Sequence, residues 1–322
     1  MTSKLILSLL LIFNSISILT AQKTIYPPAL RQGDTIAICS PAGAVDTFKV
    51  EGAVKVLTQQ GWNVKVMPHA LGQKGNYSGT ADERLDDLRQ ALADPAVKAV
   101  LCSRGGYGVV HIIEQLDTID LSTNPKWLIG FSDISALHAL HTRQGVASLH
   151  SNMTGDIMKA GTDDPNATMF KILQGQRPDL VFQSDSTLDR PGTATGKLVG
   201  GNLAVLADLI ATKYDVLSPG TILFIEDIGE PIYKIERILY QLRMTGVLPN
   251  LAGLIVGQFT EYHPDRSYET MEQMIRDMVA DYKYPVAFNA PIGHVDYNMP
   301  VIENAPVTLT VGNGRTTLKY ND

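Results

Sequence analysis

The hydrophobic residues of this chain follow two alternating patterns from Thr35 onwards. Short and almost entirely apolar runs, such as TIAICSP and VKAVLCS, are typical of strands that are buried on both faces. Between these runs, apolar residues recur every three or four positions, which is the pattern of an amphipathic helix. Thr80 and Glu83 begin one such helix with the spacing of a capping box. Strands that alternate with helices in this way predict an α/β fold with a parallel sheet covered on both faces.

A stretch rich in Asp, Thr, Gly and Pro separates two regions of regular pattern and predicts an interdomain connection at 159–196. The N-terminal parallel domain then spans 33–158 and the second domain spans 197–322. In the first domain we expect strands at 35–41, 62–68, 97–103, 126–132 and 146–151, and helices at 49–61, 80–93, 109–116 and 134–144. In the second we expect helices at 202–211, 232–246 and 269–282, strands at 221–227 and 251–259, and a hairpin at 307–320.

The N-terminus predicts export. One positive charge at Lys4 precedes an apolar core from Leu5 to Phe13, and small residues follow at Thr20 and Ala21. This is the pattern of a secretory signal peptide at 1–21, and its apolar core is too short to span a bilayer. We therefore expect an exported, periplasmic protein with no stable membrane insertion after cleavage.

Charge and composition narrow the class of ligand. The chain has 322 residues, 44% of them hydrophobic, and a formal net charge of -6. It has no basic cluster of the kind that meets nucleic-acid phosphates. We therefore expect no nucleic-acid partner, and a small molecule or a neutral polymer as the ligand.

The two cysteines, Cys39 and Cys102, allow two interpretations. Export would permit a disulfide between them. Both end apolar runs, however, where a thiol usually packs as a small core residue. We favour two free buried thiols, with the disulfide as the alternative.

Ser132 lies in KWLIGFSDIS, where an apolar run ends at Gly130 and a helical pattern begins at Ile134. Taken alone, this junction favours a helix cap, because a serine hydroxyl there can accept a free backbone N–H. A strand-to-helix turn can also hold a nucleophile exposed, with backbone donors beside it. A nucleophilic serine further requires a base and an acid that orients the base.

The second domain offers candidates for that base and acid. TILFIED ends a predicted strand in Glu226 and Asp227, and NAPIGHVD places His294 in a loop. The order serine, acid, histidine is one known way to assemble a catalytic triad. Ile134 replaces the second glycine of G-x-S-x-G, so an ordinary α/β-hydrolase is disfavoured.

SRGGYG, from Ser103 to Gly108, follows a predicted strand and precedes a helix. It lacks the rest of a dinucleotide fingerprint, so a nucleotide cofactor is not indicated. The stretch is either a tight turn or a loop whose N–H groups bind an anion or a reacting oxygen.

A metal site is not expected, although His138 and His141 lie three residues apart on a predicted helix. No glutamate stands between them as in H-E-x-x-H, and no cysteine or carboxylate cluster completes a ligand set. We predict no metal and no other cofactor.

Five motifs in fixed order carry a family resemblance: SRGGYG, GFSDIS, GGNLAVL, FIED with its following ERILYQL helix, and the late GH pair. From about Gly33 to near the C-terminus, the chain resembles the LD-carboxypeptidases, serine peptidases that act on murein peptides. The resemblance implies a Rossmann-like parallel α/β domain joined to a smaller, β-rich α+β domain, with the active site between them. It also implies a homodimer.

The resemblance implies a role for five residues. Ser132 would be the nucleophile, Glu226 the orienting acid and His294 the general base. The backbone N–H groups of Gly106 and Asp133 would form the oxyanion hole. The implied reaction releases terminal D-alanine from murein tetrapeptide, in peptidoglycan turnover or recycling. Two alternatives stay open: a microcin C-type hydrolase of acyl-nucleotide peptides, and a non-catalytic exported protein that binds muropeptides.

Two further side chains are candidates for substrate binding. A carboxypeptidase must hold the terminal carboxylate of its substrate, and Arg104 beside the glycines is the cation best placed for it. Its alternative role is an ion pair that braces the turn. Asn202 of GGNLAVL could donate to the substrate, although a helix cap is the favoured interpretation.

Overall fold

The computed structural model describes residues 23–160, 164–185, 187–312 and 314–321. The predicted signal peptide, 1–21, lies outside these residues. Within the described ranges, no helix combines the length and the apolarity that a bilayer span requires.

The first sheet has six strands among the described residues, in the order β11-β5-β4-β3-β1-β2. Five of them are parallel, as predicted from their apolar runs. The sixth, β11, comes from near the C-terminus and pairs antiparallel with β5. The strands are β1 (Thr35–Cys39), β2 (Asn63–Val66), β3 (Val97–Cys102), β4 (Trp127–Gly130), β5 (Ser148–His150) and β11 (Val301–Glu303).

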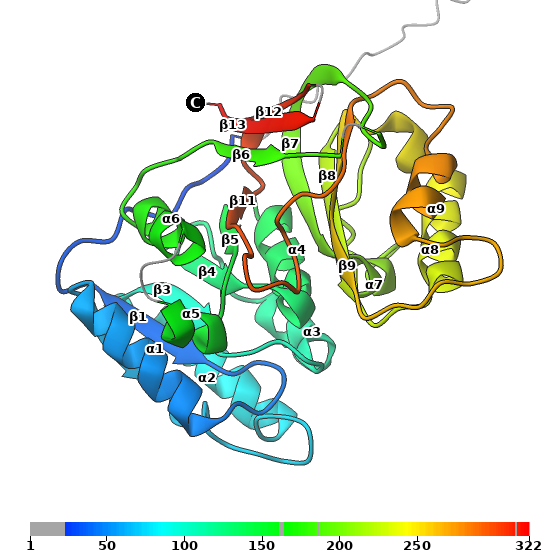
Figure 1. The fold of residues 1–322 in the computed structure, drawn as a ribbon. Helices are drawn as coiled ribbons and strands as arrows, with labels where there is room; N and C mark the ends of the chain where they lie inside the picture. The colour runs from blue at the N-terminus through cyan, green and yellow to red at the C-terminus, as the bar shows by residue number, and fades with distance from the viewer. Residues whose placement is uncertain (1–22, 161–163, 186, 313, 322) are drawn as a thin grey trace, which may run out of the picture.

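Helices cover both faces of this sheet, as expected for buried parallel strands (Figure 1). Ile36 and Ile38 of β1 pack in the same core cluster as α1, α5 and α6, whereas Ala37 and Cys39 pack in the cluster of α2, α3 and α4. The predicted capping box of Thr80 and Glu83 begins α2. The helices are α1 (Thr47–Gln59), α2 (Ala81–Ala93), α3 (Ile113–Leu116), α4 (Ser135–Arg143), α5 (Thr154–Ala160) and α6 (Asp164–Leu173), with 3-10 turns η1 (Val109–His111) and η2 (Ser132–Ile134).

The second sheet has seven strands in the described part of the chain, in the order β10-β9-β8-β7-β12-β13-β6. Strands β7 to β10 are parallel to one another, and β12, β13 and β6 extend the sheet antiparallel. The strands are β6 (Leu180–Gln183), β7 (Gly192–Asn202), β8 (Ile222–Ile228), β9 (Gly253–Thr260), β10 (Val286–Ala287), β12 (Pro306–Val311) and β13 (Arg315–Tyr320).

The two faces of this second sheet have different partners. One face packs on α7 (Leu203–Asp208), α8 (Ile232–Met244), η3 (Leu248–Asn250) and α9 (Met271–Met278). The other face packs in the same core cluster as the first sheet, so the two sheets contact each other (Figure 1). We call this interface between the two sheets the seam. An α/β fold with a parallel first sheet and a second, β-rich unit is therefore confirmed.

The segment predicted as an interdomain connection, 159–196, contributes α6, β6 and the start of β7. β6 is a short edge strand, and β7 begins with Gly, Thr and Ala, so neither has a strong apolar pattern. β11 was also not expected, because its three residues pair with a strand about 150 positions earlier. How the chain divides into independent folding units stays a prediction.

Cys39 and Cys102 are free and fully buried, so the favoured interpretation of two free thiols is confirmed. They are register partners on the neighbouring strands β1 and β3. Burial raises the pKa of both thiols, which keeps them protonated as small core groups.

Candidate active site

Ser132 occupies a strained turn between β4 and η2. Its φ is 67°, a left-handed value that costs a residue with a side chain about 1 kcal/mol or more. Gly130, two residues earlier, has φ 156°, and the intervening Phe131 is extended. The side chain of Ser132 is half-buried at the carboxyl end of the sheet. This backbone is the kind of sharp strand-to-helix turn that can present a nucleophile.

The interpretation of Ser132 as a helix cap is wrong. The cap position of η2 is Phe131, which makes no side-chain cap bond. Ser132 is the first residue inside the turn, so its hydroxyl is not where a cap accepts free N–H groups. Among the described residues, the hydroxyl has no hydrogen-bond partner.

The glycine-rich loop after β3 lies directly against the serine. A Cβ on Gly105 would be 2.7 Å from the Cβ and 2.9 Å from the Oγ of Ser132, so any side chain there would displace the hydroxyl. The loop is held in place by the N–H of Gly43, which donates to the carbonyl of Gly105 at 3.0 Å. Gly106 has φ 110°, which only glycine adopts readily. That the N–H of Gly106 faces a reacting oxygen stays a prediction.

Asp133 connects the Ser132 turn to this same loop. Its buried carboxylate accepts the N–H of Val109 at 2.9 Å, just after RGGYG. Burial raises the pKa of Asp133 to about 6, against the opposing effects of that bond and of the Arg84 charge. The carboxylate thus fixes the orientation of η2, and the backbone N–H of Asp133 stays a predicted oxyanion donor.

The predicted acid and base are in contact. His294 Nδ1 donates to Glu226 Oε2 at 2.7 Å, and the Glu226 side chain is completely buried. A proton on Nδ1 leaves Nε2 as the nitrogen that can accept a proton. The imidazole is 16% exposed, so it reaches the surface of the seam while its carboxylate partner does not.

The environment of His294 favours its protonated form. Burial lowers its pKa, but the bond to Glu226 and the charges of Glu226, Asp227 and Glu261 together raise the pKa above its ordinary value. The glycine of the GH motif allows this contact, because a Cβ on Gly293 would be 2.9 Å from Glu226 Cβ and Oε2. Its φ of 126° also requires glycine.

The Ser132 turn and the His294–Glu226 pair meet at the seam. The rings of Phe131 and His294 are edge-to-face, with centroids 4.9 Å apart. Ser135 Oγ accepts the N–H of Asn202 at 3.0 Å, and Asn202 is the register partner of Glu226. Ser132 and His294 are not hydrogen-bonded to each other in this structure. Catalytic hydrogen bonds often form only with substrate bound, so the complete triad stays a prediction.

Asp227 and Asn202 have structural partners. Asn202 Oδ1 accepts the N–H of Val205 at 3.1 Å, which confirms the cap interpretation, and its Nδ2 donates to Asp227 at 2.9 Å. Asp227 also accepts the N–H of Ala204, and burial raises its pKa to about 6. Of the two carboxylates at the end of β8, Glu226 thus hydrogen-bonds to His294, and Asp227 accepts a hydrogen bond at the start of α7. A substrate contact of Asn202 stays a prediction.

Arg104 lines a cavity of about 570 Å³ beside the glycine loop. Its Nη1 donates to the carbonyl of Ala44 at 2.9 Å, and it makes no ion pair with a described residue. The structure therefore gives no support to a bracing ion pair. The cavity is formed by the loops after β1, β2 and β3, through Gly43–Asp46, Gln73, Gly75–Tyr77, Arg104, Gly106 and Tyr107.

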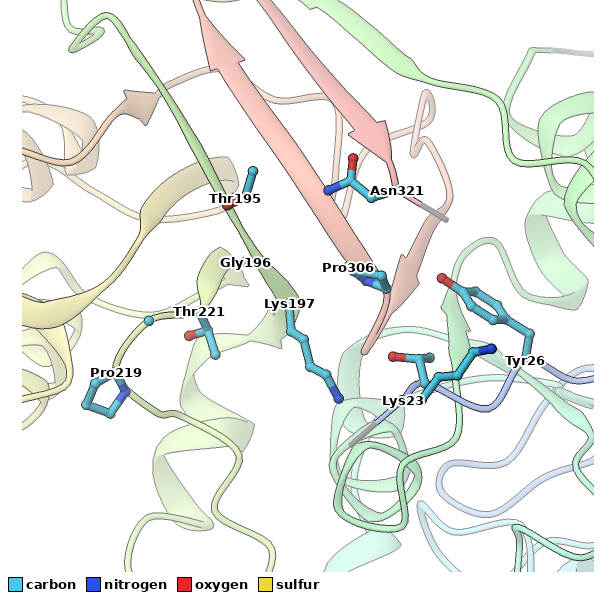
Figure 2. A pocket seen from close by; sticks show the side chains of 11 residues that line it. Lys23, Tyr26, Thr195, Gly196, Lys197, Pro219, Thr221, Pro306 and Asn321 are labelled. Atoms are coloured by element: carbon cyan, nitrogen blue, oxygen red, sulfur yellow. The ribbon is translucent and has the colours of Figure 1, made fainter. Parts of the chain in front are cut away.

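A second cavity, of about 670 Å³, has a separate set of lining residues (Figure 2). Its walls include Thr195 and Lys197 at the start of β7 and Thr221 just before β8, whereas Glu226 is near the other end of β8. No histidine or carboxylate side chain is among its described lining residues. Its described lining therefore has neither a histidine base nor an acid to orient one.

The two histidines of α4 are core residues. His138 bonds to the carbonyl of Gly130 and to Ser148 Oγ, and His141 bonds to the carbonyl of Leu137. Burial lowers the pKa of His138 to about 3 and of His141 to about 4, so both are neutral. No group of three or more potential metal ligands occurs among the described residues, and the absence of a metal stays a prediction.

Sequence reasoning missed two contacts of the site. Gly105, not only its neighbour Gly106, packs on the serine, and the choice between adjacent glycines needs coordinates. Phe131 packs on the ring of His294, and in the sequence only its position next to Ser132 indicated a role in the site.

Comparison with known proteins identifies the family of the chain. Residues 36–151 match the LD-carboxypeptidase N-terminal domain and residues 195–309 match the LD-carboxypeptidase C-terminal domain. The chain is 35% identical to a probable murein peptide carboxypeptidase of Bacillus subtilis, over 85% of this chain and 88% of the relative. It is 30% identical to the murein tetrapeptide carboxypeptidase of Pseudomonas aeruginosa, over 80% and 87%.

Solved structures show the same fold. The muramoyltetrapeptide carboxypeptidase of Oxalobacter formigenes is 26% identical, with a TM-score of 0.80 over 89% of this chain and 99% of that chain. MccF in complex with glutamyl sulfamoyl guanosine is 18% identical, with a TM-score of 0.79 over 91% and 98%, and this likeness shows the fold alone. The resemblance of the five motifs is thereby confirmed: the chain belongs to the LD-carboxypeptidase family and is a carboxypeptidase.

Proposed function

We propose that this chain is a serine carboxypeptidase that releases terminal D-alanine from murein tetrapeptide, in peptidoglycan turnover or recycling. The observation that carries the proposal is the 2.7 Å bond between His294 and Glu226, on the same seam as the strained Ser132 turn. The relatives named as murein peptide carboxypeptidases support the class of substrate.

In the proposed mechanism, Ser132 Oγ attacks the carbonyl carbon of the amide between the diamino acid and D-alanine. His294 Nε2 accepts the hydroxyl proton, and Glu226 stabilises the imidazolium that forms. The proton then passes to the nitrogen of D-alanine as the C–N bond breaks, which leaves an acyl-enzyme. Water, deprotonated by His294, attacks this ester, releases the tripeptide and restores the serine.

Negative charge develops on the carbonyl oxygen during both attacks. The backbone N–H groups of Gly106 and Asp133 are the proposed donors, and each such donor contributes about 10²- to 10³-fold to the rate. The close approach of Gly105 to Ser132 supports this, since it keeps the loop within reach of the reacting carbonyl.

The 570 Å³ cavity is the proposed substrate site. Arg104 would hold the terminal carboxylate there, because its guanidinium is exposed, is fixed by the carbonyl of Ala44 and makes no direct ion pair with a described residue. Asn202 is a weaker candidate for a substrate contact, since both of its polar groups have protein partners.

The test is incubation of the purified mature chain with disaccharide tetrapeptide and measurement of free D-alanine. Ser132→Ala should lower turnover by about 10⁶-fold, and Ser122→Ala, an exposed serine outside the seam, should leave it unchanged. Binding without release of D-alanine would instead indicate a non-catalytic muropeptide-binding protein. Unchanged turnover in Ser132→Ala would remove Ser132 from the mechanism.

An acyl-nucleotide hydrolase is the second candidate, because the cavity has an aromatic wall on which a base could stack. The rings of Tyr77 and Tyr107 line it with centroids 6.1 Å apart, and Tyr107 is 54% exposed. Competition between the tetrapeptide and an aminoacyl-sulfamoyl adenosine in one assay distinguishes the two. Preferential turnover of the nucleotide analogue would favour the second candidate.

We further propose a periplasmic location and a homodimer. The N-terminal pattern of residues 1–21 supports the first, and the resemblance to the LD-carboxypeptidases implies the second. Cell fractionation tests the location, and sedimentation of the purified chain tests the dimer. A full-length cytoplasmic protein or a monomer at micromolar concentration would contradict them.

A further inference from the structure

His150 is a buried histidine that the proposed mechanism does not use. It ends β5 as the register partner of Gly130 on β4, and it is completely buried. Neither ring nitrogen has a hydrogen-bond partner on another described residue, unlike those of His138, which are both bonded. Burial lowers the pKa of His150 well below its ordinary value, and the nearby His138 and His294 add to this effect. The ring is therefore neutral.

The ring of His150 lies in a series of ring contacts that crosses the seam. It is 5.8 Å from the ring of Phe131 and 5.2 Å from that of Phe224, the latter edge-to-face. Phe131 in turn contacts the His294 ring at 4.9 Å. Phe224 lies two residues before Glu226 on β8. His150 thus contacts one residue next to the nucleophile and another close to the acid.

The unpaired nitrogens indicate which property of His150 matters. A buried polar group without a partner lowers stability, and an aromatic hydrocarbon of similar size would avoid this cost. If the nitrogens have no role, the ring acts through its shape and its contacts. Replacement by phenylalanine should then preserve the function of the residue, whereas truncation should not.

We infer that His150 is a positioning residue, whose ring supports Phe131 so that Phe131 holds the His294 imidazole beside Ser132. This inference rests on the proposed roles of Ser132 and His294. The nucleophile comes from the first sheet and the acid–base pair from the second-sheet side, so their alignment depends on contacts across the seam. A displacement of about 1 Å at such a site can cost about 10²-fold in rate.

The test measures the reactivity of Ser132 directly, with a fluorophosphonate that phosphonylates activated serines and displaces fluoride. Rates of labelling are measured by mass spectrometry on the full mature chain. His150→Ala should slow the labelling of Ser132 by about 10²-fold, and His150→Phe should label at the parent rate. His141→Ala is the matched control, because His141 is also buried and, within the described part of the chain, its ring contacts none of the aromatic rings of the seam. It should also label at the parent rate.

Kinetics on tetrapeptide add a readout that a loss of stability alone would not move. His150→Ala should lower kcat and leave KM near the parent value, since His150 is not among the described residues that line the proposed substrate cavity. A parent labelling rate in His150→Ala would overturn the inference. Equal slowing in His150→Phe would also overturn it, because the nitrogens would then be the active part.

A second variant keeps the test decisive if His150→Ala does not fold, as judged by circular dichroism. Phe131→Leu removes the ring that lies between His150 and His294, and it should slow labelling to a similar extent. Parent-rate labelling of Phe131→Leu would contradict the inference. A parent chain that is not labelled at Ser132 would overturn the proposed mechanism and this inference together. A labelled parent that fails to release D-alanine would overturn only the proposed substrate.

Discussion

Gly293 is the position where a single methyl group should separate the base from the acid. Its φ of 126° is unfavourable for any residue with a side chain, at a cost of about 1–3 kcal/mol. A Cβ there would also lie 2.9 Å from both the Cβ and the Oε2 of Glu226, and overpacking of this kind costs about 1–3 kcal/mol more. Gly293→Ala should therefore lower the free energy of unfolding by about 2–6 kcal/mol.

Gly293→Ala should lower kcat even where the variant is fully folded, so the loss of activity should exceed what unfolding alone would cause. Relief of the clash requires Glu226 or the His294 loop to move by several tenths of an ångström, and misplacement of about 1 Å costs about 10²-fold. Gly229→Ala is the matched control, because Gly229 also has a positive φ, of 73°, but has open space around it. It should lose about 1 kcal/mol and keep its kcat.

The assay combines urea unfolding with the release of D-alanine at a temperature where both variants are folded. A Gly293→Ala enzyme with the parent kcat would refute the reasoning, since the acid–base contact would then tolerate the displacement. Equal losses of kcat in both glycine variants would also refute it, because the clash with Glu226 would not be the cause.

Three further outcomes can be measured on the same enzyme. Because the pKa of His294 is raised and the base must be neutral, kcat/KM should rise with pH through a midpoint above 6.5. Glu226→Gln should move this midpoint to lower pH and reduce kcat by up to about 10⁴-fold. An unmoved midpoint would contradict the assignment of Glu226 as the orienting acid. Protonated His294 also stabilises the fold, because its pKa is higher in the folded than in the unfolded chain. This stabilisation is complete below pH 6.5 and is lost as the pH rises through the folded pKa. The difference in unfolding free energy between the parent and His294→Ala should therefore shrink at alkaline pH. Arg104→Gln should raise KM for tetrapeptide by about 10- to 100-fold and leave KM for a peptide that ends in an amide unchanged. Equal effects on both peptides would exclude a contact between Arg104 and the terminal carboxylate.

The sequence predicted the first sheet well because its strands are buried on both faces and its helices have regular apolar faces. The capping box at Thr80 and the end of α1 near Gly61 follow from local chemistry alone. By contrast, β11 has three residues and forms only by pairing with β5, and the start of β7 is Gly- and Thr-rich. Such edge and crossover strands depend on distant partners, which a local pattern does not contain.

The same difference between local patterns and distant contacts applies to the candidate site. Ser132, Glu226 and His294 could be singled out as polar residues at strand ends and in a loop, and the family resemblance implied their roles. Local reasoning could not separate the roles of Glu226 and Asp227, which depend on contacts with the His294 loop and with α7. It also assigned Ser132 to a cap, since the left-handed φ that excludes this role is visible only in the folded backbone.

A crystal structure of the Ser132→Ala variant with bound murein tetrapeptide tests the central claim most directly. We expect the scissile carbonyl carbon beside residue 132, the D-alanine nitrogen within about 3 Å of His294 Nε2, and the terminal carboxylate on Arg104. A peptide bound instead in the cavity around Lys197, or with its amide far from His294, would contradict it.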